Sequence, residues 1–228
     1  MLVLSVESSA VTASAALAED DEILKCEFIN KGLTHSETLS PLVEKVMEGR
    51  KYGELDAIAV SSGPGSFTGV RIGVAAVKGL AFPNDTPCIS VSSLEAIAYN
   101  FTDENGIICA VMDARRMQFY NALFEVKDGK VNRLTPDRAI SLEDLQKELE
   151  QYDRVIAAGD GAFLLCEKTT LQNIELAPEN KVYQSAAGVC LAAQNKNTVS
   201  ASALMPVYLR QSQAERELKL KKSSKKEN

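Results

Sequence analysis

The chain contains 228 residues, of which 45% are hydrophobic and 25% are charged, and its formal net charge is −6. This length holds one large domain or two small ones, and the composition is ordinary for a soluble globular protein. No apolar run approaches the roughly 20 residues of a membrane-spanning helix, so no contact with a membrane is expected.

The first half of the chain predicts an alternation of strands and helices. Residues 1–6 lack a basic segment and lead straight into Glu7, so they indicate a first strand rather than a signal peptide. A helix is expected after Thr34 and Glu37, which have the spacing of a capping box, but Pro41 means that it is kinked or begins near Ser40. The expected strands are residues 2–8, 12–18, 22–29, 57–60 and 88–91, and the expected helices are residues 36–48, 66–81 and 92–99.

The second half repeats this order. Ser141 is the predicted N-cap of a helix, and a glycine turn at residues 159–161 precedes a further helix. The expected strands are residues 107–112, 117–126, 130–134 and 155–158, and the expected helix is residues 142–150.

Two copies of a β-β-β-α-β-α pattern resemble the layout of the actin, sugar-kinase and Hsp70 superfamily. This resemblance implies an α/β fold with two lobes around a cleft. We expect an N-terminal lobe at residues 1–102, a C-terminal lobe at residues 103–210 and a basic tail at residues 211–228.

The tail differs in charge from the rest of the chain. Its six basic and three acidic residues give it a net charge of +3, which leaves −9 for residues 1–210. Such a tail fits either a contact with nucleic acid or a solvated helix end. The five cysteines are scattered, without a CxxC pair or a Cys/His cluster, so we expect reduced thiols in a cytoplasmic protein.

A glycine-rich turn at residues 61–73 is the most specific local feature. It connects an apolar strand to a helix, where Ser66 or Thr68 can cap free N–H groups, so it fits either a phosphate-binding loop or a tight packing turn. It is not a Walker loop, because no Gly-Lys-Ser/Thr follows. Together with the end of the first strand and the second glycine turn it defines a candidate phosphate cleft: Glu7, Ser8, Ser9, Gly63, Gly65, Ser66, Gly69, Gly159 and Gly161.

The helix after this turn is apolar nearly all round, which indicates burial on more than one side. The pattern leaves open whether its second side packs inside the domain or against a partner. His35 is the single histidine of the chain, and its place suggests a surface or helix-start role rather than catalysis.

The motif SGPGSFTGVRIG at residues 62–73 closely resembles the TsaB (YeaZ) family. Matching segments are VESS at residues 6–9, HSETL at residues 35–39 and PVYLR at residues 206–210. The resemblance implies a role in making threonylcarbamoyladenosine at position 37 of ANN-decoding tRNAs. It also implies a protein without catalytic activity of its own, because the paralogue TsaD holds its metal with two histidines where this chain has Ser93 and Ile97. No metal or other cofactor is therefore expected.

The same resemblance implies that the helices at residues 36–48 and 66–81 contact TsaD, or a second copy of the chain when TsaD is absent. The ATPase TsaE is implied to bind near the TsaB–TsaD junction, and the tail could add to contact with tRNA. The candidate interface residues are Leu39, Val43, Val46, Arg71, Val74 and Lys78.

Two alternatives are enzymes. A small-molecule phosphotransferase or ATPase of the actin-like superfamily remains open, since the cleft residues fit it. A peptidase is excluded because the metal ligands that it would need are missing.

Overall fold

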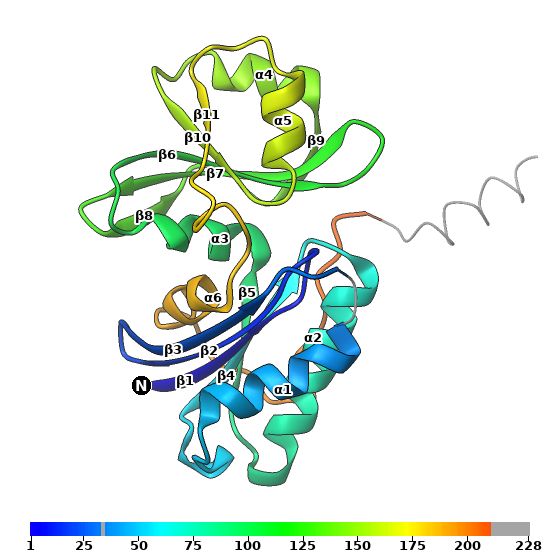
Figure 1. Ribbon diagram of the computed structural model, residues 1–228, viewed down its shortest axis with the longest axis vertical. Helices are drawn as coiled ribbons and strands as arrows, with labels where there is room; N and C mark the ends of the chain where they lie inside the picture. Colours follow the sequence, from blue (N-terminus) through cyan, green and yellow to red (C-terminus); the bar gives the residue numbers. More distant parts are fainter. Residues whose placement is uncertain (33–34, 211–228) are drawn as a thin grey trace, which may run out of the picture.

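Two mixed sheets with the same strand order form the two lobes of the chain. The computed structural model describes residues 1–32 and 35–210 and is shown in Figure 1. The first sheet has the order β3-β2-β1-β4-β5, and the second has the order β11-β10-β6-β7-β8, which is the same arrangement read from the other edge. The internal duplication predicted from the sequence is therefore confirmed.

The first lobe follows the expected element order. Its two hairpins are antiparallel, whereas β1, β4 and β5 run parallel. Its elements are β1 (Leu2–Glu7), β2 (Ala13–Glu19), β3 (Glu22–Ile29), α1 (His35–Met47), β4 (Ala57–Gly63), α2 (Phe67–Ala81), β5 (Cys88–Ser92) and α3 (Ser93–Ala98).

The second lobe adds elements that the sequence did not predict. An extra strand, β9, pairs with β7 beside the regular sheet, and the short β11 completes the second copy. The elements are β6 (Gly106–Asp113), β7 (Gln118–Lys127), β8 (Lys130–Arg133), β9 (Arg138–Ser141), α4 (Leu142–Leu149), β10 (Val155–Ala158), α5 (Ala162–Lys168), β11 (Ile174–Leu176) and α6 (Ala186–Ala193).

Helix starts follow the expected capping chemistry where the structure describes them. Ser66 accepts a hydrogen bond from the N–H of Gly69, and Ser141 accepts one from Asp144. Helix α1 begins at His35, which excludes a start near Ser40 and places Pro41 inside the helix. Thr34, the proposed cap, and the tail at residues 211–228 lie outside the described residues.

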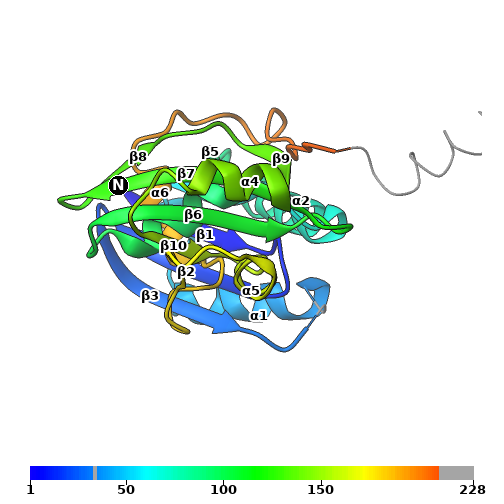
Figure 2. The same cartoon turned by 90° about the horizontal axis from the view of Figure 1, so that it is seen from above.

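The helices form layers in which α3 and α6 exchange lobes. Helices α1 and α2 cover one face of the first sheet, and α6, from the second half of the chain, covers the other. Helix α3, from the first half, packs beneath the second sheet, whose opposite side carries α5 (Figures 1 and 2). The expected lobe boundary at residue 102 therefore separates sequence segments that are interleaved in space.

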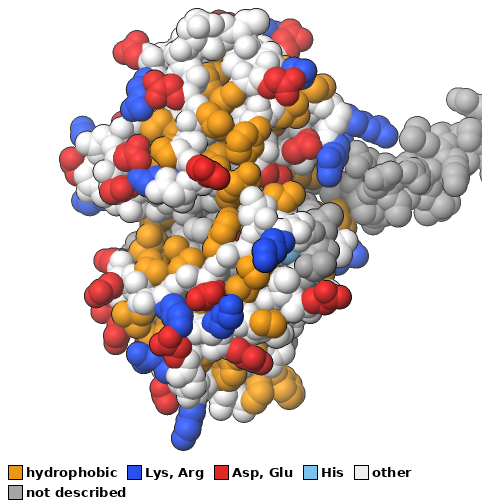
Figure 3. Space-filling model, in the orientation of Figure 1, with side chains coloured by type: hydrophobic (Ala, Val, Ile, Leu, Met, Phe, Trp, Pro, Cys, Tyr) orange, Lys and Arg blue, Asp and Glu red, His pale blue; other side chains and the backbone are white. Residues whose placement is uncertain are grey.

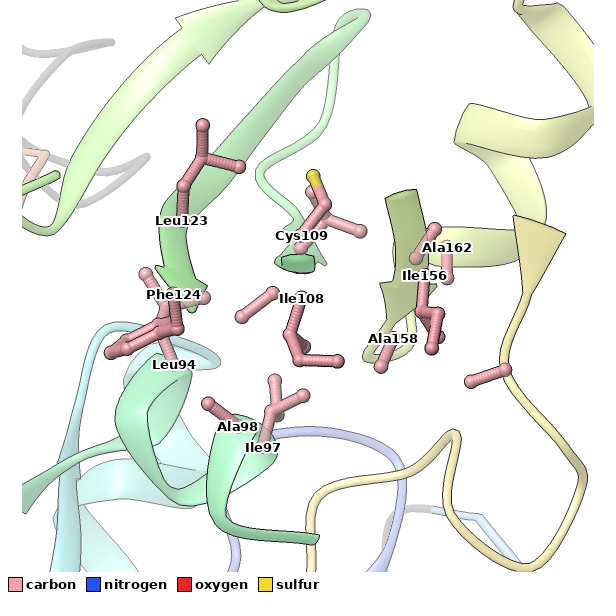
Figure 4. Packing of buried hydrophobic residues seen from close by; sticks show 14 of the residues in the cluster. Leu94, Ile97, Ala98, Ile108, Cys109, Leu123, Phe124, Ile156, Ala158 and Ala162 are labelled. Carbon is pink, nitrogen blue, oxygen red and sulfur yellow. The ribbon is translucent and has the colours of Figure 1, made fainter. Parts of the chain in front are cut away.

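Buried apolar side chains hold this exchange in place. Figure 4 shows Leu94, Ile97 and Ala98 of α3 facing Ile108 of β6 and Phe124 of β7, and all five are fully buried. Helix α6 contributes a second cluster with β1, β2 and β4. Each lobe thus uses a helix from the other half of the sequence to complete its core.

Residues 199–210, here called the strap, return to the first lobe. Val199 forms a β-bridge with Cys88, and the buried Leu204 joins the core beneath α1 and α2. The N–H of Val207 donates to the carbonyl of Ser62 at 2.7 Å, and Arg210 donates to the carbonyl of Ala114 at 2.6 Å. The strap therefore connects the glycine turn to the turn between β6 and β7. Among the helices of the described residues, none combines the length and apolar character needed to cross a membrane.

Candidate functional site

The end of β1 places a carboxyl group in the interior, at the junction of the lobes. Glu7 is fully buried, and its Oε1 atom accepts a hydrogen bond of 2.5 Å from the N–H of Ser9. Burial raises the pKa of Glu7, and the Ser9 and Ser61 groups oppose that rise. Its second oxygen, Oε2, has no protein partner among the described residues.

Gln184, which the sequence analysis missed, joins this junction from the segment before α6. Its Nε2 atom donates to Oδ1 of Asp160 at 2.8 Å, while its Oε1 atom has no described protein partner. Burial raises the pKa of Asp160 to about 6, helped by the charge of Asp113 and opposed by the Gln184 amide. The charge of Asp160 in turn adds to the raised pKa of Glu7. We call Glu7, Ser9, Asp160 and Gln184 the interlobe cluster.

The predicted phosphate loop packs against the chain itself. The N–H of Ser66 donates to the carbonyl of Ser9 at 2.7 Å, and the Ser8 hydroxyl donates to the carbonyl of Gly69 at 2.9 Å. A methyl group on Gly69 would lie 2.1 Å from the Ser8 carbonyl oxygen. This geometry favours the packing turn over the phosphate cradle, because the loop meets backbone atoms at the positions where a cradle leaves room for oxygens.

The other candidate glycines make equally close approaches. An added Cβ would lie 2.3 Å from the Val207 carbonyl at Gly63 and 2.3 Å from the Ser9 carbonyl at Gly65. At the second turn it would lie 2.0 Å from the Val111 carbonyl at Gly159 and 2.8 Å from the Met112 carbonyl carbon at Gly161. The structure therefore brings the predicted glycines to the lobe junction, where each packs on a neighbouring strand end, turn or strap.

Ser93 and Ile97 occupy one face of α3 and are both engaged in packing. The Ser93 hydroxyl lies 2.6 Å from that of Ser61, and Ile97 is fully buried, with its Cδ1 atom 3.0 Å from the position that a Cβ at Gly159 would take. No group of three or more His, Cys, Asp or Glu side chains in the described residues is placed to hold a metal ion. His35 is buried, and its Nε2 atom lies 2.8 Å from the Ala10 carbonyl, which confirms the helix-start role and contradicts a surface position.

Most of the predicted partner residues are buried in the chain itself. Leu39, Val43, Val46 and Val74 are buried in the first-lobe core, so they offer little surface to a partner, and their contact with one stays a prediction. Their spacing marks the inner stripe of each helix, which the sequence could not distinguish from an outer stripe. The two remaining candidates bind the strap instead: Arg71 donates to the Tyr208 hydroxyl at 2.8 Å, and Lys78 donates to the Ser202 carbonyl at 3.3 Å.

A groove between α1 and α2 is open at the surface of the first lobe. Its volume is about 320 Å³, and Leu39 and Val43 reach only its floor. Its α2 side consists of small or apolar residues, which allow close approach of another helix. The groove is lined by Leu39, Ser40, Val43, Glu44, Tyr52, Ala75, Ala76, Gly79 and Leu80.

The duplicated sheets, the exchanged helices and the glycine turns at the lobe junction define the class of two-lobed, actin-like α/β proteins. EutJ from Carboxydothermus hydrogenoformans shares this fold at a TM-score of 0.51 and 10% identity, covering 84% of this chain and 90% of that one. YeaZ from Pseudomonas aeruginosa superposes with a TM-score of 0.78 at 25% identity, over 91% of this chain and 99% of that one.

Sequence comparison then gives the family. Residues 31–220 match the family model described as TsaD, tRNA N6-adenosine threonylcarbamoyltransferase. The tRNA threonylcarbamoyladenosine biosynthesis protein TsaB of Bacillus subtilis (strain 168) is 31% identical over 227 residues, 94% of this chain and 96% of the relative. The chain belongs to the TsaB (YeaZ) family. A transferase of the TsaD type, from Erythrobacter litoralis, is 32% identical over 42% of this chain and 33% of its own length.

Proposed function

We propose that this chain is a non-catalytic subunit in the synthesis of threonylcarbamoyladenosine at position 37 of tRNA, and that it binds and activates the transferase TsaD. Membership of the TsaB family supports the pathway. The observation that carries the docking role is the groove between α1 and α2, which the chain's own residues leave open. The occupied positions of Ser93 and Ile97, where TsaD is expected to hold its metal, support a subunit that relies on a catalytic partner.

The chemistry of the groove indicates an apolar helix face as its occupant. Ala75 and Gly79 are exposed on α2, and the floor is aliphatic. Burying apolar surface against such a floor contributes about 25 cal/mol per Å². Exposed Phe82, which follows α2 directly, extends the apolar surface available beyond the helix end. In the absence of TsaD, a second copy of the chain would use the same groove, and TsaE would bind beside the TsaB–TsaD junction of a cytoplasmic complex.

The test is a charged side chain placed in the groove. Ala75→Arg changes an exposed residue, so the monomer should keep its circular dichroism spectrum and melting temperature. Size-exclusion chromatography with light scattering should then show loss of co-elution with TsaD, and TsaD should lose its stimulation in the tRNA modification assay. The matched control is Ala139→Arg, an exposed alanine on β9 of the second lobe, which should pair and stimulate like the unchanged chain.

Unchanged pairing of Ala75→Arg would show that this groove is not the contact. Appreciable modification activity of the isolated chain would overturn the non-catalytic role itself.

A phosphotransferase is the second candidate, and one observation favours it. Buried polar atoms of Glu7, Ser9 and Gln184 have no described protein partner at the lobe junction, where the superfamily resemblance places a nucleotide. Calorimetric titration of the isolated chain with ATP and Mg²⁺, repeated on Glu7→Gln, separates the two proposals. Binding of ATP by the unchanged chain that is lost in Glu7→Gln would support the phosphotransferase. If the unchanged chain does not bind ATP, the phosphotransferase proposal fails and the subunit role is the one that stands.

A further inference from the structure

An arginine-rich surface lies where the strap crosses from the first lobe to the second. We call it the arginine surface and define it by Arg71, Arg115, Arg116, Tyr208 and Arg210. The first four are exposed, and Arg210 is half-buried. Figure 3 shows basic side chains at the tip of the second lobe nearest the end of the strap.

The first-lobe part of this surface is an ordered aromatic and guanidinium stack. The rings of Phe67 and Tyr208 are parallel within 1° and 4.0 Å apart. The Arg71 guanidinium lies 4.8 Å from the Phe67 ring centre and 5.6 Å from that of Tyr208, and it donates to the Tyr208 hydroxyl. Because these groups hold one another, little side-chain entropy remains to be lost when a ligand binds.

The second-lobe part is the turn between β6 and β7. Three consecutive residues of this turn, Arg115, Arg116 and Met117, have left-handed backbone angles, which non-glycine residues seldom adopt. Arg210 donates to the carbonyl of Ala114, the residue before them. The strap therefore joins the stack and the turn into one surface. The chain continues from Arg210 into a segment whose sequence contains six further lysine and arginine residues.

Ion pairing distinguishes these arginines from the others. Of the eight arginines in the described residues, four form an ion pair with a described carboxylate: Arg115, Arg133, Arg138 and Arg154. Of the four that do not, Arg50, Arg71, Arg116 and Arg210, three belong to this surface. Arg115 itself meets Asp113 only at 3.4 Å with its side chain largely exposed. Three guanidinium groups thus lack a described carboxylate partner, on a body whose net charge is −9, and each keeps N–H donors beyond the single hydrogen bonds that Arg71 and Arg210 make.

We propose that the arginine surface binds the phosphate backbone of RNA, with Tyr208 and Arg71 offering a stacking platform to a base. The proposal rests on the proposed function, since the relatives' pathway modifies a tRNA. Arginine presents a planar fork of donors that matches phosphate, and aromatic rings stack on unpaired bases. The guanidinium groups come from α2, the strap and the β6–β7 turn, so they are arranged along a surface rather than around one enclosed pocket. A polymer of phosphates fits this arrangement better than a free nucleotide.

The experiment measures binding of a fluorescein-labelled, unmodified tRNA transcript to the complex of this chain with TsaD, by fluorescence anisotropy over a range of salt concentrations. Arg116→Glu should weaken binding about tenfold and reduce the slope of log affinity against log salt by about one. The control is Arg50→Glu, an exposed arginine without a described ion pair that follows α1, which makes the same change of charge outside the surface. It should bind like the unchanged complex.

Equal affinities of Arg116→Glu and Arg50→Glu would overturn the proposal. Displacement of the RNA by millimolar ATP would also overturn it, by showing a nucleotide site instead. Chromatography of each sample first establishes whether the complex with TsaD forms. If it does not form, the docking function fails, and the same titrations on the isolated chain still decide whether Arg116 contacts RNA.

Discussion

Substitution of Gly69 by alanine tests whether the glycine turn serves close packing. The new Cβ would lie 2.1 Å from the Ser8 carbonyl oxygen, whereas real Cβ contacts essentially never fall below 3.0 Å. The first turn of α2 must therefore move by roughly 1 Å, which strains or breaks the bonds from Ser8 to Gly69 and from Ser66 to Ser9. Overpacking costs about 1–3 kcal/mol and each lost bond costs about 1 kcal/mol, while alanine returns about 1 kcal/mol of helix propensity. The expected net loss of stability is about 3 kcal/mol.

Gly79, in the same helix, is the matched control for this substitution. No heavy atom lies within 4 Å of a Cβ placed there, so Gly79→Ala should stabilise the chain by about 0.5–1 kcal/mol through helix propensity alone. Urea unfolding followed by circular dichroism should give a lower midpoint for Gly69→Ala and a slightly higher one for Gly79→Ala. The melting temperature of Gly69→Ala should fall by about 6–12 °C. If Gly69→Ala is as stable as the unchanged chain, close packing does not explain this glycine.

Two further predictions concern the lobe junction and the strap. The folded-state pKa of Asp160 is about 6, above its ordinary value of 3.8, so its contribution to stability is complete below pH 4 and is lost as the pH rises through 6. The Asn side chain of Asp160→Asn can still accept the hydrogen bond from Gln184. In urea unfolding, the free energy of unfolding of this variant should equal that of the unchanged chain at pH 4 and exceed it by about 1–3 kcal/mol at pH 7.5. A difference that does not depend on pH would contradict this reasoning. Tyr208→Ala removes a ring stack and a hydrogen bond and should lower the free energy of unfolding by about 1–2 kcal/mol. Tyr208→Phe keeps the stack and should lower it by about 0.5 kcal/mol or less. Equal losses of stability for the two variants in thermal melts would mean that the stack contributes nothing.

The sequence predicted elements wherever a periodic pattern meets a capping or turn residue. Ser66 and Ser141 mark helix starts correctly, and the duplicated order of strands is confirmed by the two sheets. The first glycine turn and the end of β1 lie together because β1 and β4 are neighbouring parallel strands, whose carboxyl ends meet at one edge of the sheet. Local signals were sufficient for these features.

Helix α6 shows why other features could not be predicted. Its sequence AAGVCLAA is apolar on every side, since it lies between the first sheet and α3, and a helix buried over most of its surface has no amphipathic period. Gln184 was missed for a related reason, because a single polar residue before an apolar run gives no sign of its partner Asp160, 24 residues away. The pattern also does not show which side of α2 is exposed: Val74 and Ala75 are adjacent in sequence, yet one is buried and the other exposed.

The length of the glycine motif follows from the number of segments that it must contact. Gly63 meets the strap at Val207, Gly65 meets Ser9, and Gly69 meets Ser8, so one turn is packed from two directions within seven residues. A phosphate loop needs its free N–H groups directed at a ligand, but here the N–H of Ser66 is bound by Ser9. Because the strap also carries Tyr208 and Arg210 to their partners, a shift at the turn would displace the start of α2, the strap and the β6–β7 contact together. The motif therefore determines how α2, with its groove and its arginine, is presented at the surface.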